Sequence, residues 1–136
     1  MQINNSKNRK NKGFTLIELI VVVSIILILS GFLVPKVIGY QNKAKEAKAI
    51  NTARQIYDTS MQLYTEEQGV LTKGKLIDSI LSVTGLQIDD DDVTLATDGV
   101  QTIKFTSDTK LYNMVVTPAD NSYTVKDTAG TTVYPK

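Results

Sequence analysis

One long apolar run near the N-terminus most constrains what this chain can fold into. It extends from Phe14 to Val34 and contains a single charged residue, Glu18. At about 1.5 Å per residue a helix of this length spans about 31 Å, which matches the hydrocarbon core of a membrane. The run therefore predicts a helix that is surrounded by lipid or by other apolar helices, unlike the amphipathic helices of an ordinary small domain.

Glu18 is the residue of this run that needs a physical explanation. An ionised side chain in a membrane costs about 2.5–3.5 kcal/mol on insertion scales, so it normally has a partner or a function. The run contains no Lys, Arg or His that could pair with it. We therefore expect that its partner is not a side chain of the same helix and that it comes from another molecule.

A short basic leader precedes the apolar run. The leader and the run together allow three interpretations. A cleaved secretory signal normally has an apolar stretch of roughly 7–15 residues, which this run exceeds, and Gly31 to Pro35 lacks the small-residue cleavage pattern. A plain membrane anchor would keep its basic N-terminal side in the cytoplasm, but it has no use for Glu18. The cations of the leader are Lys7, Arg9, Lys10 and Lys12.

The third interpretation rests on residues 10–20, which read Lys-Asn-Lys-Gly-Phe-Thr-Leu-Ile-Glu-Leu-Ile. This stretch closely resembles the N-terminus of type IV prepilins and of the related pseudopilins. The resemblance implies that a membrane-embedded prepilin peptidase cleaves after Gly13 and methylates the new N-terminus at Phe14. The apolar helix then stays on the mature chain, first as a membrane anchor and later in the core of a helical filament.

The resemblance also implies a partner for Glu18 in assembly. Cleavage exposes a cationic amine at Phe14, and Glu18 of an incoming subunit neutralises the amine of a subunit already in the filament. In an apolar core such a pair is favourable only when it is close and hydrogen-bonded, so it sets register more than stability. The alternative is that Glu18 reaches the membrane surface or pairs within its own subunit.

Gly31 and Pro35 bracket the end of the apolar run, and they predict a helix kink. Proline removes one backbone hydrogen bond and clashes with the preceding turn of a helix. A simple kink where the helix leaves the membrane is one outcome. The family resemblance implies another, in which this region unwinds inside the filament and makes it extensible.

The remaining sequence predicts an α+β fold. A helical pattern continues to about Gln68, and Gly69 is a plausible end of the helix. A short helix is expected over Lys75 to Val83, ended by Gly85. The amphipathic half of the long helix carries a largely apolar stripe that comprises Ala49, Ala53, Ile56, Ser60 and Leu63. The expected strands are Thr102–Thr106, Leu111–Thr117, Ser122–Lys126 and Thr131–Tyr134. The short connections predict an antiparallel meander that packs on the amphipathic half of the long helix.

These elements divide the chain into four expected segments. They are a cleaved leader at residues 1–13, a transmembrane and filament-core helix at 14–35, the amphipathic half of the same helix at 36–68, and a globular head at 69–136. The chain has no cysteine, so the disulfide loop of many Gram-negative pilins is absent. We expect strand pairing and the packing of Tyr134 to close the head instead, and a Gram-positive source.

Composition argues against catalysis and against a bound cofactor. The chain contains no Cys and no His, so the commonest general base and the commonest metal ligand are missing. We therefore expect no enzyme activity, no catalytic residues, no cofactor and no metal. Asp89 to Asp92 is the only acidic run, and it lacks the spacing of an EF-hand, so a solvated loop is favoured there. Calcium binding stays open because the family resemblance implies that some relatives bind calcium in the head.

Charge is segregated along the chain. Between Lys36 and Arg54 five basic residues face a single acid, Glu46, whereas after Gly85 the acids outnumber the lysines. The basic stretch of one subunit is therefore expected either to face the acidic head of a neighbour in contacts that salt weakens, or to meet lipid headgroups before assembly.

The sequence thus predicts a structural subunit of a type IV pilus, which serves adhesion, motility or biofilm formation. Its expected partners are other copies of itself, the prepilin peptidase, the assembly platform with its ATPase, and the membrane, with no nucleic acid. The expected location is the cytoplasmic membrane before assembly and the cell surface after it. The alternatives are a pseudopilin of a type II secretion or competence system, and a membrane-anchored binding protein that never polymerises.

Overall fold

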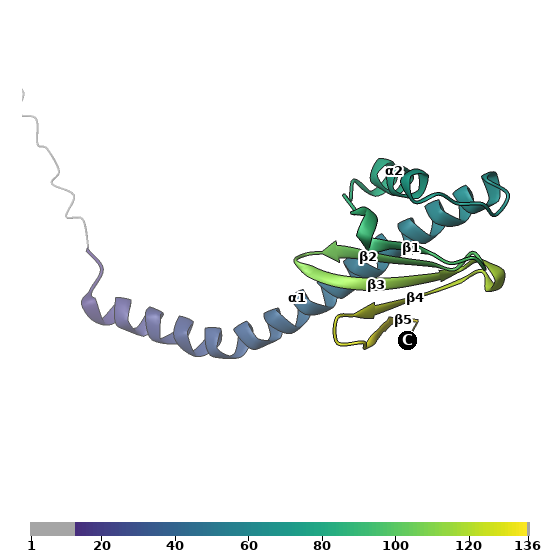
Figure 1. The fold of residues 1–136 in the computed structure, drawn as a ribbon. Helices are drawn as coiled ribbons and strands as arrows, with labels where there is room; N and C mark the ends of the chain where they lie inside the picture. Colours follow the sequence, from purple (N-terminus) through teal and green to yellow (C-terminus); the bar gives the residue numbers. More distant parts are fainter. Residues whose placement is uncertain (1–12, 136) are drawn as a thin grey trace, which may run out of the picture. The chain divides into compact units, whose positions relative to one another are not determined.

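A computed structural model describes residues 13–135 of the chain (Figure 1). The described residues divide into two compact units, with the boundary between Tyr40 and Gln41. The helix α1, Leu16–Glu66, contributes its first part to one unit and its second part to the other. Residues 1–12, and with them nearly all of the predicted leader, lie outside the described part.

The first unit consists of the apolar part of α1. Its large apolar side chains, from Leu16 to Tyr40, are about half exposed or more in the isolated chain. By length and composition α1 can cross a membrane. Surface apolar area on this scale is unusual for a soluble monomer and needs a covering of lipid or of other helices. The sequence-based expectation of such an environment is consistent with this exposure.

The second unit contains the sheet, whose five strands follow one another in chain order, each antiparallel to the next. Four strands were expected from the sequence, and all four are present. The fifth strand, β1, was not expected, because it is only three residues long and lies at the edge of the sheet, where it pairs with β2 alone. The strands are β1 Val93–Leu95, β2 Gln101–Ser107, β3 Lys110–Thr117, β4 Ser122–Asp127 and β5 Thr132–Tyr134.

The shorter helices connect and flank this meander. The helix α2, Lys73–Thr84, is slightly longer than expected and ends at Gly85, whose φ of 70° places it in the left-handed region. That region favours glycine, so the predicted end of the helix is confirmed. Two short 3-10 turns complete the unit, η1 at Asp90–Asp92 and η2 at Pro118–Asp120. The acidic run therefore forms a turn rather than an irregular loop.

The core of the second unit lies between the amphipathic part of α1 and one face of the sheet. Ala49, Ala53, Ile56 and Ser60 are fully buried, as the helical spacing of the sequence predicts. They meet the inward-facing side chains of the meander, among them Ile103, Phe105, Tyr112, Met114, Val116 and Val125. Alternation along β2 and β3 leaves Thr, Lys and Asn on the opposite face. The predicted α+β fold is therefore confirmed.

Stacked tyrosine rings connect the C-terminal strand, the strand beside it and α1. Tyr134 on β5 stacks on Tyr123, and Tyr123 stacks on Tyr57 of α1, with ring centroids 4.7 Å apart in both pairs. Burial, followed by the neighbouring Tyr134, raises the pKa of Tyr123 to about 12. About two turns further along α1, Tyr64 covers Gly99, where a Cβ atom would come within 2.9 Å of the tyrosine oxygen. The C-terminal strand is thus held by pairing and stacking, as expected for a chain without cysteine.

Candidate functional site

The first turn of α1 forms a reciprocal cap around Glu18. Thr15 is the residue before the helix, and its hydroxyl accepts a hydrogen bond from the backbone N–H of Glu18 at 3.3 Å. The carboxylate oxygen Oε2 of Glu18 in turn accepts from the backbone N–H and from the hydroxyl of Thr15, both at 2.8 Å. This is a capping box, in which two backbone donors at the start of a helix are satisfied by each other's side chains.

The cap gives Glu18 a local role beside the expected one. A cation from another molecule stays a prediction, and within the chain Thr15 supplies two hydrogen-bond donors to Oε2. The sequence did carry the signal, because a threonine followed three residues later by glutamate is the usual form of this cap. The negative charge, however, has no cationic partner in the described chain. Glu18 therefore has both a local structural role and a charge that remains to be balanced.

The predicted cleavage junction lies just before this cap. Phe14 is 88% exposed and stands outside the helix, which begins two residues later at Leu16. Cleavage after Gly13 would leave the backbone N–H of Thr15 and its hydroxyl in place, so the cap would survive on the mature chain. The new amine would then lie close in sequence to a preorganised carboxylate.

The structure keeps α1 continuous through Pro35. Proline has no N–H, and the carbonyl that would have received its hydrogen bond belongs to the residue four positions earlier, which is Gly31. The two residues named in the sequence as a kink site are therefore linked through one missing hydrogen bond. No heavy atom lies within 4 Å of the position a Cβ would take at Gly31, so the isolated chain gives no steric reason for glycine there.

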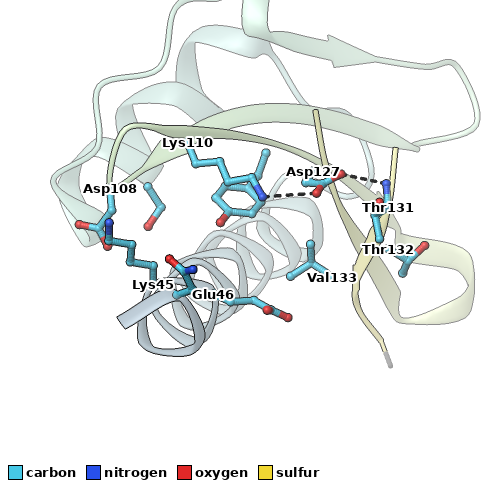
Figure 2. A pocket seen from close by; sticks show the side chains of 11 residues that line it. Lys45, Glu46, Asp108, Lys110, Asp127, Thr131, Thr132 and Val133 are labelled. Atoms are coloured by element: carbon cyan, nitrogen blue, oxygen red, sulfur yellow. Dashed lines mark hydrogen bonds and ion pairs between the residues drawn. The ribbon is translucent and has the colours of Figure 1, made fainter. Parts of the chain in front are cut away.

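A second candidate site is a polar groove of about 500 Å³ in the second unit (Figure 2). One wall is α1 from Asn42 to Glu46, and the other walls are the β2–β3 turn and the β4–β5 turn. Tyr112 and Val133, both buried, form its apolar part. The sequence did not reveal this groove, because its walls are brought together only by the packing of the helix on the sheet.

Two ion pairs order the groove. Lys48 contacts Asp108 of the β2–β3 turn at 2.8 Å, and Lys110 contacts Asp127 at 3.3 Å. Asp127 also accepts hydrogen bonds from the backbone N–H groups of Thr131 at 2.9 Å and Ala129 at 3.0 Å. The bond from Thr131, the nearby Lys110 and the bond from Ala129 together hold the pKa of Asp127 below its usual range. Asp127 is therefore the side chain that organises the β4–β5 turn.

Ser107 is the unusual member of the groove lining. It is only 7% exposed, and its hydroxyl has no hydrogen-bond partner among the described residues. A buried polar group without a partner costs about 1–3 kcal/mol, so each instance needs an explanation. Among the cations that line the groove, Lys45 forms no ion pair with a described residue. The groove lining thus contains one buried hydroxyl without a hydrogen-bond partner, on Ser107, and one ammonium group without an ion pair, on Lys45.

The acidic run contributes to surface ion pairs instead of forming a cluster. Asp90 lies 3.6 Å from Lys73, and Asp92 lies 3.8 Å from Lys104. Within residues 13–135 no group of three or more His, Cys, Asp or Glu is arranged so that it could hold a metal ion. The four consecutive carboxylates share a turn, but their side chains do not converge on one point.

Comparison with known proteins adds to this geometry. The family model of the prokaryotic N-terminal methylation motif matches residues 8–34. The chain is 37% identical over 60 residues to the type IV major pilin protein PilA of Myxococcus xanthus, which covers 44% of this chain and 27% of that protein. It is 39% identical over 71 residues to the type II secretion system core protein G of Vibrio cholerae, which covers 47% of this chain and 49% of that protein. No solved structure matches the chain.

The matches cover only part of each relative. The chain spans about a quarter of the first relative and about half of the second. The relatives come from Myxococcus xanthus and Vibrio cholerae, and the expected Gram-positive source receives no support from them. Both are named as structural components, and neither is named as an enzyme. The methylation motif at residues 8–34 and the two relatives thus support, over the N-terminal part of the chain, its similarity to type IV pilins and pseudopilins.

Proposed function

We propose that this chain is a subunit of a type IV pilus, which is processed by a prepilin peptidase and polymerises into a surface filament. The observation that carries the proposal is the preorganised Glu18 at the start of an apolar helix whose large side chains are about half exposed or more. Oε2 of Glu18 is held by Thr15, and its charge has no cation within the described chain. A cleaved, cationic Phe14 of a neighbouring copy would supply that cation.

The domain organisation follows from the same proposal. Residues 1–13 are the leader that is removed, and 14–35 form the segment that spans the membrane before assembly and the filament core after it. The segment 36–68 contains the rest of the helix, which ends at Glu66, and leads into the head, which extends to residue 136. Cleavage falls between Gly13 and Phe14, and methylation falls on the amine of Phe14. Gly31 and Pro35 mark the place where the helix bends or opens.

The partners also belong to this proposal. The chain contacts other copies of itself through the apolar helices, because neighbouring helices can cover the side chains that lipid covers before assembly. Processing requires the peptidase, and extraction from the membrane requires an assembly platform driven by an ATPase. The subunit resides in the cytoplasmic membrane before assembly and on the cell surface afterwards.

A pseudopilin of a secretion system is the second candidate. It is favoured by the match to the secretion-system core protein, which covers a larger share of that relative than the match to the pilin does. The two functions differ in product, since a pilin accumulates in long surface filaments and a pseudopilin forms a short assembly in the cell envelope. A membrane-anchored binding protein that keeps its leader is a third, less supported candidate.

One experiment separates the three. Filaments are sheared from cells that express the chain, and the purified protein is analysed by N-terminal sequencing and mass spectrometry. A pilus subunit is expected in abundance in the sheared fraction, beginning at a methylated Phe14. A protein that begins at Phe14 but stays in the envelope fraction would favour the pseudopilin. A protein that retains residues 1–13 would contradict both.

A further inference from the structure

The groove lies at one end of the sheet, and an acidic turn lies at the other. In an antiparallel meander alternate turns share an end, so the β2–β3 and β4–β5 turns lie together and the β1–β2 and β3–β4 turns lie opposite them. The first two turns form walls of the groove. The β3–β4 turn, η2 with Asn121, therefore projects from the end of the second unit that faces away from the groove.

Asp120 is the carboxylate of that opposite end that lacks a partner. It is exposed, and neither a hydrogen bond nor an ion pair joins its side chain to another described residue. Other acids near this end are engaged, since Asp98 accepts from the N–H of Val100 at 3.1 Å and Glu67 pairs with Lys75 at 2.7 Å. Buried Pro118 anchors the turn that presents Asp120.

We propose that the groove binds the β3–β4 turn of a second copy of this chain. Asp120 of that copy accepts hydrogen bonds from the ammonium group of Lys45 and from the buried hydroxyl of Ser107. This proposal rests on the proposed function, because it names a contact between subunits of the same polymer. It gives the lining cation that has no ion pair and the unpartnered hydroxyl one common acceptor, and charge-assisted hydrogen bonds of this kind are the stronger ones.

The position of the two surfaces determines what such a contact builds. Groove and turn lie at opposite ends of one sheet, so a single copy cannot join its own two surfaces. We infer a heterologous contact, in which each copy donates a turn to the next and receives one from the copy before, because a filament repeats the same contact along its length. Heterologous contacts whose rotation does not close generate open helical filaments. The charge on the head thus favours the same polymer that the apolar helices form.

The remaining charges of the groove are compatible with an incoming carboxylate. Asp108 is already paired with Lys48, and Asp127 is held by Lys110 and by backbone donors. Glu46, the third acid of the lining, is also engaged in an interaction of its own. None of these carboxylates is therefore a free charge in the groove, whereas Lys45, on the helical wall, forms no ion pair with a described acid.

Paired charge reversals test the proposal in full-length protein in cells that assemble it. Lys45→Glu and Asp120→Lys are each expected to lower the yield of sheared filament about tenfold, because a close interfacial charge pair couples by at least that factor. The double variant restores the pair in reverse and is expected to recover most of the wild-type yield. Asp78→Lys is the matched control, since Asp78 is an exposed acid on α2 without an ion pair among described residues. It is expected to leave the yield unchanged.

Ser107→Ala supplies a second readout. Removing a hydroxyl that has no partner in the isolated chain is expected to leave the thermal stability of the membrane-extracted subunit equal or higher, while filament yield falls. Unchanged filament yield in Ser107→Ala would mean that water satisfies the hydroxyl, and it would overturn the proposed contact. Single reversals without effect, or a double variant without recovery, would overturn it as well. If the wild-type chain itself forms no filaments, the proposed function fails, and this contact fails with it.

Discussion

At the scale of single residues, Glu18 combines two roles that the sequence alone did not separate. It caps the first turn of α1 through Thr15, and it carries a charge in an apolar segment. A neutral glutamine at the same position can still accept the hydrogen bond from the backbone of Thr15, so the two roles can be tested independently.

We therefore predict that Glu18→Gln preserves the helix cap but strongly reduces assembly. Insertion and leader cleavage are expected to be normal, while filament yield falls about tenfold or more because no anion balances the amine of the neighbouring Phe14. Immunoblots of the membrane and sheared fractions measure both effects. The complementary variant Thr15→Ala removes the side-chain cap and keeps the charge, and it is expected to assemble better than Glu18→Gln. Wild-type filament yield from Glu18→Gln would exclude a charge-pairing role.

Ser60 supports a prediction about stability. Its hydroxyl is fully buried beneath the sheet and has no partner among the described residues. Ser60→Ala removes an unsatisfied polar group without leaving a large cavity, so it is expected to raise the free energy of unfolding by about 1 kcal/mol.

Thermal unfolding followed by circular dichroism measures this change. The matched control is Ser82→Ala, because Ser82 is an exposed helical serine whose hydroxyl bonds to the carbonyl of Ser79 at 2.8 Å. The control corrects for the better helix propensity of alanine. A destabilised Ser60→Ala protein would show that the hydroxyl has a partner, such as a buried water.

At the scale of elements, the β4–β5 turn depends on one carboxylate. Asp127 is ionised more readily in the folded chain than in a peptide, because the N–H groups of Thr131 and Ala129 and the ammonium of Lys110 favour its charged form. A depressed folded-state pKa contributes stability above the unfolded pKa, near 3.9, and that contribution is lost as the pH falls through the folded value.

The turn is therefore predicted to be sensitive to acid. We expect wild-type protein to have a higher melting temperature than Asp127→Asn at neutral pH, with a constant difference down to about pH 5 and a shrinking difference below about pH 4. Melting curves of both proteins from pH 2 to 8 provide the measurement. Asp120→Asn serves as the control, since the carboxylate of Asp120 forms no hydrogen bond or ion pair with a described residue. A difference between wild type and Asp127→Asn that persists at the lowest pH would contradict the ionic explanation.

The same element scale shows how far sequence reasoning reaches. Periodicity located both helices and four strands, because stripes such as Ala49, Ala53 and Ile56 report burial directly. It missed β1, which has too few residues for an alternating pattern to show. Periodicity also did not predict the groove, because Ser107 and Lys45 are far apart in sequence and no local pattern indicates that they line the same cavity. The capping box could have been predicted from Thr15 and Glu18, because a threonine followed three residues later by a glutamate is its usual form.

At the scale of the whole molecule, two kinds of contact with different physics support one polymer. The first unit offers apolar helix surface, whose association does not depend on salt, and the second offers a polar groove and an acidic turn, whose attraction is screened at high ionic strength. The proposed groove contact involves a single turn, whereas stable protein interfaces bury about 1,200–2,000 Å². It therefore becomes effective where the helices already hold neighbouring copies at a high effective concentration.

This division predicts the behaviour of the second unit alone. A fragment of residues 41–136 retains every side chain of the buried core, from Ala49 to Val133. We expect it to fold, to unfold cooperatively in urea with a slope of about 1–3 kcal/mol per M, and to remain monomeric, because the groove contact alone is too small. Sedimentation and urea titration of the fragment measure these properties, with the Ser60→Ala fragment as an internal check of the core. An unfolded fragment would mean that the apolar part of α1 is needed to form the head. A fragment that assembles into filaments by itself would show that the head contacts, and not the helices, drive polymerisation.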